Sequence, residues 1–371
     1  MSTDTPLIEK REELKRQLAA GEYRTLVDVV LDRAGQTIQK ITRNPHPISP
    51  WYSITMFYLL LLLVAFAGLF LIGEYSAFKT QFAPFSAAFV PLSLLVGYLN
   101  VVSIVAGNIY IHRVLRTFHD NVINAIESIT TLDDFENWLT AVCNRKNHFV
   151  FSIIGGFIVG IYQVYVLKNA GITVLLSTAI GTILLNTFSI VFLFLLVYMI
   201  VLSARLGRYH LKLYTAYPAS SEVINRLADL LGNFVYLVAL YAALLTLLIA
   251  IQQLLISLGA LMILLFWIPI TGMFVLNQSS LSSIIQRSKW NSLNGIQAKV
   301  EQLHLSEKLG EKETMDTINR LMDYHDRISA TRNSALDLRA TLNFVNSLLL
   351  PLLAFLLGNF DLVLNLFARR P

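Results

Sequence analysis

Residues 230–286 have the sequence LLGNFVYLVALYAALLTLLIAIQQLLISLGALMILLFWIPITGMFVLNQSSLSSIIQ and contain no Asp, Glu, Lys or Arg over 57 positions. A second uncharged run covers residues 169–204. Roughly 18 consecutive apolar, uncharged residues are enough for a helix to cross a bilayer. Both runs are much longer than this, so the chain is predicted to be an integral membrane protein that crosses the bilayer several times.

The composition of the whole chain supports the same interpretation. Of 371 residues, 55% are hydrophobic and 14% are charged, and the mean hydropathy is +0.59; a soluble domain carries about 25% charged residues. Cys143 is the single cysteine, so no intrachain disulfide can form. These features exclude a soluble enzyme, a disulfide-stabilised secreted domain and a disordered chain. The first residues, MSTDTPLIEKREELKRQLAAG, are charged and lack an apolar core, so we expect no cleavable signal peptide.

Seven hydrophobic segments can be placed along the chain, and we therefore predict an all-α polytopic membrane protein with seven transmembrane helices and cytosolic helical extensions. The segments cover residues 51–73, 86–111, 149–166, 172–204, 231–251, 254–276 and 341–368. The predicted regions are a cytosolic, helical N-terminal region (1–50), a six-helix transmembrane region (51–277) with cytosolic loops 112–147 and 205–230, a cytosolic stalk (278–340), and a seventh helix with the C-terminus (341–371).

The distribution of basic residues predicts the orientation of these segments. Of 29 Lys and Arg residues, 25 fall in residues 1–50, 112–147, 205–230 and 278–340. The positive-inside rule therefore places the N-terminus and all the large loops in the cytosol. Arg369 and Arg370 oppose this pattern if residues 341–368 cross once, and agree with it if that segment is a re-entrant hairpin. The 28 residues are too few for two full crossings. We favour a single crossing because of the polar stripe that this segment carries when it is one helix, as described below.

Local signals predict where helices begin and end outside the membrane. Thr5 and Pro6 are a typical helix start, and residues 44–50, rich in proline, end the N-terminal helical region. The sequence Thr131–Asp134 resembles a capping box. It predicts a helix with one apolar side, formed by Phe135, Trp138, Leu139 and Val142. The stalk is predicted to be two helices that are interrupted at residues 304–310.

One face of the last hydrophobic segment carries mostly polar or small residues. At spacings of 4, 3, 4, 4, 3 and 4, this stripe consists of Asn343, Ser347, Leu350, Ala354, Gly358, Asp361 and Asn365. A polar stripe that faces lipid is costly, so it should face water or protein. In a symmetric oligomer the stripe would line a pore, with a ring of Asp361 that favours cations and a ring of Leu350 that closes the path by dewetting. The alternative is that the small residues allow two helices to pack closely.

Basic residues at the cytosolic ends of two segments are candidates for ligand binding. If the fourth helix continues past the membrane, Arg205, Arg208, Tyr209 and Lys212 share one helical face. Cationic groups beside an aromatic ring can hold phosphates and stack a base. Arg145 and Lys146 before the third segment are further candidates. The alternative is that these residues only reach to lipid headgroups, as basic residues at helix ends commonly do.

The remaining motifs indicate packing rather than chemistry. Gly156 and Gly160 form a GxxxG pattern that predicts a close helix contact. His112 and His119 are seven residues apart, which is not the usual spacing of metal ligands on a helix, and we expect them at the surface. The chain has no Walker A, HExxH or GxSxG motif and no zinc-ligand spacing. We therefore expect no catalytic site, no metal and no cofactor.

The combination of seven segments, a cytosolic N-terminus, short outer loops, long cytosolic extensions and a last helix with a pore-like stripe resembles the insect olfactory-receptor channel architecture. It is also similar to bacterial antiphage effectors of the Hailong type. The resemblance implies a homotetramer in which the seventh helix lines a cation pore and the inner extensions form an anchor. It implies pore roles for Asn343, Ser347, Leu350 and Asp361, a nucleotide or single-stranded nucleic-acid ligand on the cytosolic basic surface, and a location in the bacterial inner membrane.

The sequence therefore favours an oligomeric, cytosolically gated, cation-permeable channel that acts as a membrane-depolarising defence effector. Two alternatives remain open at this stage. One is a transporter or facilitator for an uncharged or lipid-like substrate. The other is a membrane receptor or scaffold that recruits a partner through residues 278–340. Buried charges are what a proton- or sodium-coupled transporter would need, and they are scarce in these segments, which counts against such a pump.

Overall fold

A computed structural model describes residues 5–43, 46, 48–71, 73, 89–169, 176–252, 256–305 and 312–333. Within these ranges the chain is helical, apart from one isolated antiparallel bridge between Ile126 and Leu211. The elements are α1 (Thr5–Ala19), α2 (Leu26–Thr42), α3 (Pro50–Leu71), α5 (Phe89–Thr117), the π-helical turn η1 (Phe118–Val122), α6 (Ile123–Ala125), α7 (Ile129–Val142), α8 (Arg145–Asn169), α9 (Leu176–Leu206), the 3-10 turn η2 (Pro218–Ser220), α10 (Glu222–Gln252), α11 (Ile256–Leu305) and α12 (Lys312–Ser329). The predicted all-α fold is confirmed for this part of the chain.

Long apolar helices form the main body of the molecule. Within the part of the chain that the structure describes, four stretches are long and apolar enough to cross a membrane, namely Arg145–Tyr165, Ala179–Leu206, Glu222–Ala242 and Trp267–Leu305. A shorter apolar helix covers Pro50–Leu63. Helices α3, α5, α8, α9, α10 and α11 overlap the first six predicted segments, and the four candidate spans lie in α8, α9, α10 and α11. The seventh, residues 341–368, lies outside the described residues.

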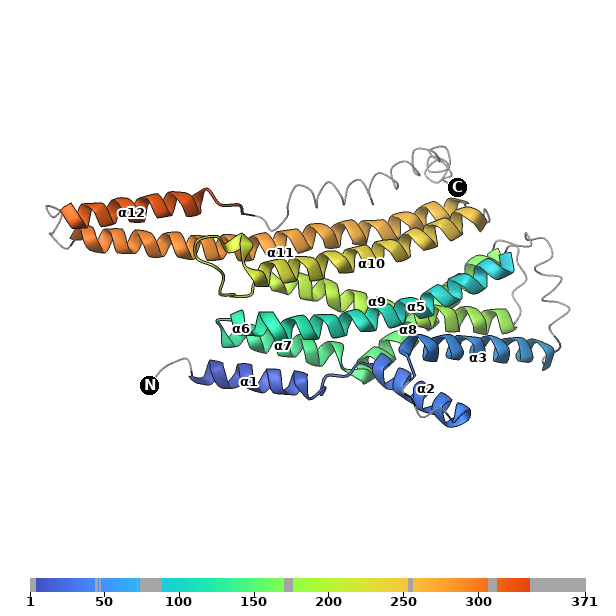
Figure 1. Cartoon of the computed structure of the whole chain (residues 1–371). Helices are drawn as coiled ribbons and strands as arrows, with labels where there is room; N and C mark the ends of the chain where they lie inside the picture. Colours follow the sequence, from blue (N-terminus) through green and yellow to red (C-terminus); the bar gives the residue numbers. More distant parts are fainter. Residues whose placement is uncertain are drawn as a thin grey trace.

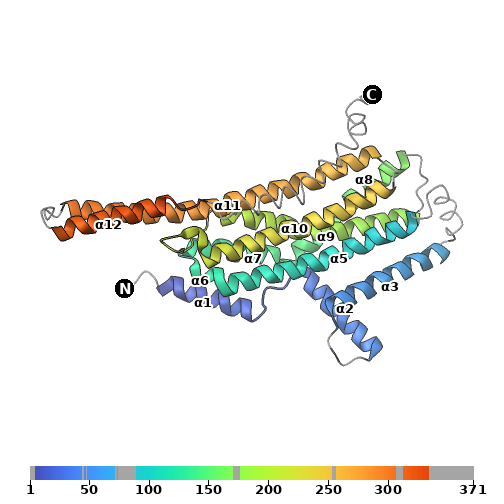
Figure 2. The ribbon, with the colours of Figure 1, turned by 45° about the horizontal axis from the view of Figure 1, so that its top comes forward.

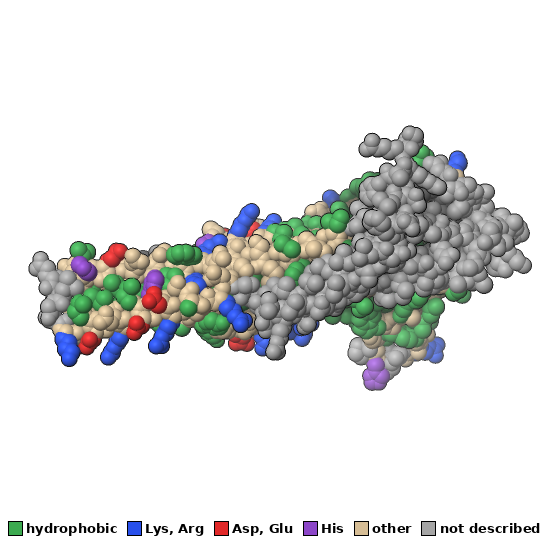
Figure 3. Space-filling model, turned by 90° about the horizontal axis from the view of Figure 1, so that it is seen from above, with side chains coloured by type: hydrophobic (Ala, Val, Ile, Leu, Met, Phe, Trp, Pro, Cys, Tyr) green, Lys and Arg blue, Asp and Glu red, His purple; other side chains and the backbone are tan. Residues whose placement is uncertain are grey.

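The long helices run roughly in one direction, and a two-helix arm extends beyond them (Figure 1). The arm consists of the second half of α11 and of α12, which lie side by side in opposite directions (Figures 1 and 2). α1 lies near the same end of the molecule. Charged side chains are spread along the arm, whereas hydrophobic side chains gather towards the opposite half (Figure 3). The structure thus separates a polar end from an apolar bundle, as the positions of the charges in the sequence predicted.

The core of the polar end is built around aromatic rings from α7 and η1. Phe118 stacks on Phe135 with ring centroids 4.1 Å apart, and Phe135 stacks on Trp138 at 5.8 Å. The Trp138 indole donates a hydrogen bond of 2.8 Å to the carbonyl of Tyr198 on α9. The predicted apolar side of the helix in 112–147 is therefore confirmed, since Phe135, Trp138, Leu139 and Val142 are all buried.

Two sequence-based expectations about helix starts are wrong in detail. Ser128 precedes the first residue of α7, so the helix begins two residues before Thr131, which is itself buried in the helix. The N-terminal region contains two helices, because the chain turns at Gly21 with positive φ before Thr25 caps α2. Loop 112–147 is largely helical, with α5 continuing to Thr117.

Ion pairs between charged side chains hold α1 against α7. The Lys10 ammonium pairs with the carboxylates of Asp133 and Glu136, and the Arg11 guanidinium donates to the carbonyl of Ile126. Hydrogen bonds from Lys10 to these two carboxylates raise the pKa of Lys10. The acidic cluster at 133–136 therefore has a specific cationic partner, which lies more than 120 residues away in sequence.

Glycines allow α8 and α9 to pack closely inside one subunit, which confirms the predicted GxxxG contact. A Cβ atom at Gly156 would lie 2.5 Å from the Cα of Thr187, and one at Gly160 would lie 2.8 Å from the Cα of Ile183. Further along the same pair of helices, the Asn186 amide donates a 2.7 Å hydrogen bond to the side-chain oxygen of Gln163. Each of these contacts requires the two helix backbones to stay close together.

Replacing Gly156 with Val should weaken the α8–α9 contact, because the added side chain would collide with backbone atoms that cannot move independently. Overpacking of this kind costs about 1–3 kcal/mol. We expect the melting temperature in detergent to fall by a few degrees. The matched control is Gly181→Ala on α9, where no atom lies within 4 Å of the added Cβ. Equal melting temperatures for the Gly156→Val variant and the unmodified protein would contradict the inferred contact.

Candidate cytosolic ligand site

The segment that follows α9 is extended rather than helical. α9 ends at Leu206, and residues 209–214 alternate between buried and exposed positions. The buried members are Tyr209, Leu211 and Leu213, and the exposed ones are His210, Lys212 and Tyr214. The predicted helical face of Arg205, Arg208, Tyr209 and Lys212 is therefore wrong.

Backbone hydrogen bonds to a distant segment explain why the helix stops. The Lys212 amide donates to the carbonyl of Ala125 at 2.6 Å, and the Glu127 amide donates to the carbonyl of His210 at 2.9 Å. These bonds replace the intrahelical bonds that a longer α9 would have made. The alternation of apolar and polar residues in Tyr209–Tyr214 has a period of two, which is the signal that could have indicated an extended segment.

Two of the predicted ligand-binding residues are engaged within the protein. Arg205 Nη1 lies 3.0 Å from Asp134 Oδ1, and the Tyr209 hydroxyl donates to Asp134 Oδ2 at 3.1 Å. Tyr209 is only 2% exposed, and burial, aided by the charge of Asp134, raises its pKa. The ring of Tyr209 is therefore not open to a stacking base in this conformation.

A pocket of about 580 Å³ lies between this extended segment and the arm. One wall is formed by residues 209–213 and Thr215, the other by α11, and Tyr324 of α12 closes one side. The volume lies within the range of about 300–1,000 Å³ that is usual for small-molecule sites. Among the described residues its charged and histidine lining is mainly basic, with one carboxylate, Glu127, beside His210, Lys212, Arg287 and Lys299. The hydroxyls and amide of Ser288, Asn291 and Ser292 add neutral hydrogen-bonding groups.

This pocket brings together two predicted ligand-binding residues, Tyr209 and Lys212, and two basic residues that the sequence did not single out. Lys212 was predicted, whereas Arg287 and Lys299 lie on α11, far along the chain. The charges in this pocket favour an anionic ligand. Arg208, Tyr209 and His210 also line a smaller pocket of about 290 Å³ with Arg205 and Asp134. Lys146 lines a separate, apolar groove along α8, and Arg145 is exposed in the first turn of that helix.

Arg287 connects the arm to the end of α9. Its guanidinium donates to the carbonyls of Gly207 at 3.0 Å, Arg208 at 3.1 Å and Tyr209 at 3.3 Å. These three carbonyls belong to the turn directly after α9, outside the helix, where a backbone carbonyl needs another donor. A change in the position of α11 would therefore displace the segment that follows α9.

Lys289, two residues further on, holds the end of α12. Its side chain is largely buried, and its ammonium donates to the carbonyls of Ser329 at 2.7 Å and Thr331 at 2.8 Å and to the side-chain oxygen of Asn333 at 2.8 Å. Three oxygen acceptors match the three protons of the ammonium group. This contact anchors the chain eight residues before the predicted seventh segment at 341–368.

Lys289→Met should release the end of α12, because Met has a similar length but cannot donate a hydrogen bond. Leaving buried acceptors without a donor costs about 1–3 kcal/mol. We expect faster hydrogen exchange and faster proteolytic cleavage at residues 329–333. The matched control is Lys299→Met, which removes an exposed ammonium from the same helix. Unchanged exchange at residues 329–333 in Lys289→Met would show that the anchor is not needed.

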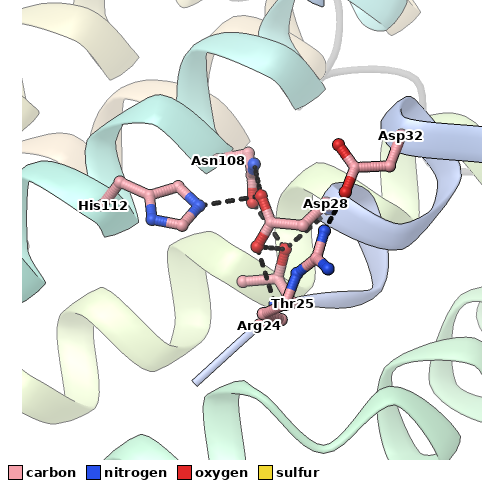
Figure 4. A network of polar contacts seen from close by, with 6 residues as sticks. All are labelled: Arg24, Thr25, Asp28, Asp32, Asn108 and His112. Atoms are coloured by element: carbon pink, nitrogen blue, oxygen red, sulfur yellow. Dashed lines mark hydrogen bonds and ion pairs between the residues drawn. The ribbon is translucent and has the colours of Figure 1, made fainter. Parts of the chain in front are cut away.

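A second polar cluster joins α2 to α5 (Figure 4). Asp28 Oδ1 accepts hydrogen bonds from the Asn108 amide at 2.6 Å and lies 2.7 Å from His112 Nε2. The Thr25 hydroxyl donates to Asn108 Oδ1 at 2.6 Å and accepts from the Asp28 amide at 3.1 Å, and Asp28 Oδ2 accepts from the Thr25 amide at 2.8 Å. His112 is therefore a partner of Asp28, which the sequence did not predict.

The electrostatics of this cluster favour a charged pair. Burial raises the pKa of Asp28, but hydrogen bonds from His112 and Asn108 outweigh it and lower the pKa to about 2. The hydrogen bond to Asp28 raises the pKa of His112, although burial acts in the opposite direction. Arg24 and Arg116 also lower the pKa of His112, and Arg24 itself pairs with Asp32.

The attachment of α2 to α5 should weaken as the pH rises. A raised His pKa stabilises the folded form fully below its ordinary value of about 6.5, and this contribution is lost as the pH rises through the folded-state pKa. Asp28 stays ionised throughout, since its pKa is about 2. We expect faster hydrogen exchange in α2, corrected for intrinsic rates, at about pH 8.5 than at about pH 5.5.

The His112→Gln variant should lose this pH dependence. His119→Gln is the control, because His119 pairs with Asp120 instead, at 2.7 Å. If His112→Gln keeps the pH dependence of the unmodified protein, the Asp28–His112 pair is not its cause.

The predicted pore-lining residues lie outside the described residues, so the structure contributes nothing on Asn343, Ser347, Leu350, Ala354, Gly358, Asp361 and Asn365. Within the part of the chain that the structure describes, no group of three or more His, Cys, Asp and Glu side chains could hold a metal ion. Comparison of the chain with known protein families, curated proteins and solved structures gave no match.

Proposed function

We propose that the chain is an oligomeric, cation-permeable channel that is gated from the cytosolic side. In this proposal the chain has seven transmembrane helices, the N-terminus and the arm lie in the cytosol, and residues 341–368 line a pore around a symmetry axis, as in a tetramer. An anionic cytosolic ligand, such as a nucleotide or a single-stranded nucleic acid, would occupy the pocket beside α11. Opening would depolarise the membrane, which suits a defence effector in a bacterial inner membrane.

The continuity of α11 is the observation that supports the proposal best. The helix has 50 residues from Ile256 to Leu305 and includes both an apolar stretch and the first helical half of the polar arm. At 1.5 Å per residue it is about 75 Å long. A continuous helix of this length links a displacement of the arm to the apolar bundle, and Pro269 lies within its apolar part.

The position of the pocket fits a role in gating. Its basic residues come from the segment after α9 and from α11, so a ligand between them would change how those two elements are held together. Arg287 connects the same two elements through backbone carbonyls. Lys289 then connects α11 to the end of α12, just before the proposed pore segment. A ligand that prefers one arrangement of the arm would shift the population of the open state.

Asp361 is the residue on which we expect cation preference to depend. A ring of carboxylates near the mouth of a pore concentrates cations and disfavours anions. In planar bilayers with a KCl gradient, the unmodified protein should show unitary currents with a cation-selective reversal potential. Asp361→Asn should keep the currents but move the reversal potential towards zero.

The control is Asp316→Asn, an exposed carboxylate on α12 that is removed from the proposed pore. It should leave the reversal potential unchanged. Bilayers that stay silent with the unmodified protein, in the presence and absence of nucleotides and oligonucleotides, would overturn the channel proposal.

A receptor or scaffold is the second candidate, and exposed apolar side chains on the arm favour it. Trp290 on α11 is 62% exposed, and Met315 and Met322 on α12 are also exposed. Large apolar side chains on a polar surface commonly mark a protein contact. This candidate would be supported if Trp290→Ser abolished co-purification of a partner protein while bilayers remained silent.

A further inference from the structure

α2 is held against the bundle by one side only, and that side is fixed by specific contacts. Thr25 and Asp28 bind Asn108 and His112 on α5 (Figure 4). Val27 and Leu31 are buried in the same core. Gly35 approaches α3, where an added Cβ would lie 3.5 Å from the Ser53 hydroxyl. The rotation of α2 about its own axis is therefore set, and its opposite side points away from the bundle.

The outward side of α2 carries an apolar stripe. Leu26, Val30, Thr37 and Ile41 follow one another at spacings of 4, 7 and 4, which keeps them on one face. Val30 is 44% exposed and Ile41 is 77% exposed. An Ile side chain exposed to this extent in water is unfavourable by about 1.5–3 kcal/mol relative to a buried one.

Charged and polar residues border this stripe in a fixed order. Arg33 and Lys40, seven residues apart, lie beside it on one side, and both are exposed. The acidic Asp32 lies with Gln36 on the far side of the helix, and Arg24 pairs with it. An apolar stripe with cations at its edge and the carboxylate turned away is the pattern of helices that lie in the interface of an anionic membrane.

The surroundings place this stripe beside other membrane-facing surfaces. α3 begins at Pro50, and Trp51 and Tyr52 in its first turn are each about two-fifths exposed, as expected for aromatic anchors at an interface. α2 also contacts α8, whose exposed first turns contain Phe149 and Val150. α2 projects sideways from the bundle beside the start of α3 (Figure 2). The apolar stripe of α2 is thus continuous with helices that are apolar on their outer sides.

We infer that α2 is an interfacial helix, whose apolar stripe enters the cytosolic leaflet of the membrane while Arg33 and Lys40 contact anionic lipid headgroups. In this position the helix sets how deeply the bundle is inserted in the membrane at α3. The assignment to the cytosolic leaflet rests on the proposed orientation of the chain, whereas the contact of the stripe with lipid follows from the contacts and the exposed side of α2 and does not depend on the channel proposal. It names lipid rather than a second protein as the occupant, since the basic border complements phosphate.

Depth-dependent fluorescence quenching tests this inference on the full-length protein. Cys143 is replaced with Ser, and single cysteines are introduced as Ile41→Cys, Val30→Cys and Gln36→Cys, each labelled with bimane and reconstituted in nanodiscs. The lipids are phosphatidylcholine with phosphatidylglycerol, with or without bromine on the acyl chains. Bromine quenches a fluorophore only when the two are close. Each labelled variant is first checked by its melting temperature and gel-filtration profile.

The bimane at positions 41 and 30 should lose most of its emission in brominated lipid, whereas at position 36, on the polar side of the same helix, it should keep its emission. Replacing Arg33 and Lys40 together with Glu should reduce quenching in phosphatidylglycerol but leave it unchanged in phosphatidylcholine alone. Emission at positions 30 and 41 that brominated lipid does not change would overturn the inference. Protection of these positions only upon subunit association would assign the stripe to a second copy of the chain and would overturn it too.

Discussion

The need to satisfy backbone polar groups where α9 leaves the apolar bundle governs the architecture of the polar end. After Leu206 the chain is no longer helical, and its backbone forms two hydrogen bonds with residues 125 and 127. Arg287 then donates to the carbonyls of Gly207 and Arg208 in the turn that follows the helix. Because orphan backbone groups are costly inside a protein, these partners join the end of α9, the end of α6 and α11 into one unit. The basic pocket exists because the extended segment stands apart from α11 instead of continuing as a helix.

The two halves of the molecule are stabilised by different kinds of contact. In the apolar half, Gly156 and Gly160 let α8 and α9 approach closely, and packing of surfaces holds them together. In the polar half, individual charged residues hold specific partners, such as Lys10 with Asp133 and Lys289 with the end of α12. Charged contacts of this kind depend on solution conditions, while glycine packing does not. We therefore expect a conformational response to a ligand or to pH to occur in the polar half.

Much of the helical layout could be predicted, and its failures have clear physical causes. The interruption of the stalk at 304–310 agrees with α11 ending at Leu305 and α12 beginning at Lys312. The prediction that α9 continues through residues 207–212 was wrong. The sequence there fits two patterns, a helix with one basic face and an extended segment in which apolar and polar residues alternate. The helical spacing of Arg205, Arg208 and Lys212 was given more weight than the alternation of Tyr209, Leu211 and Leu213.

By itself the sequence determined that this is a helical protein with apolar spans, and which residues carry the charge at their ends. Hydropathy and charge are local properties, and a bilayer acts on each segment separately. Only the tertiary structure decided which charges share a pocket and which are used within the protein. Lys212 and Lys299 line the same pocket because α9 ends early and α11 runs past it. Arg205 and Tyr209 instead form hydrogen bonds with Asp134. Such pairings depend on contacts between residues that are distant in the chain, and no local pattern encodes them.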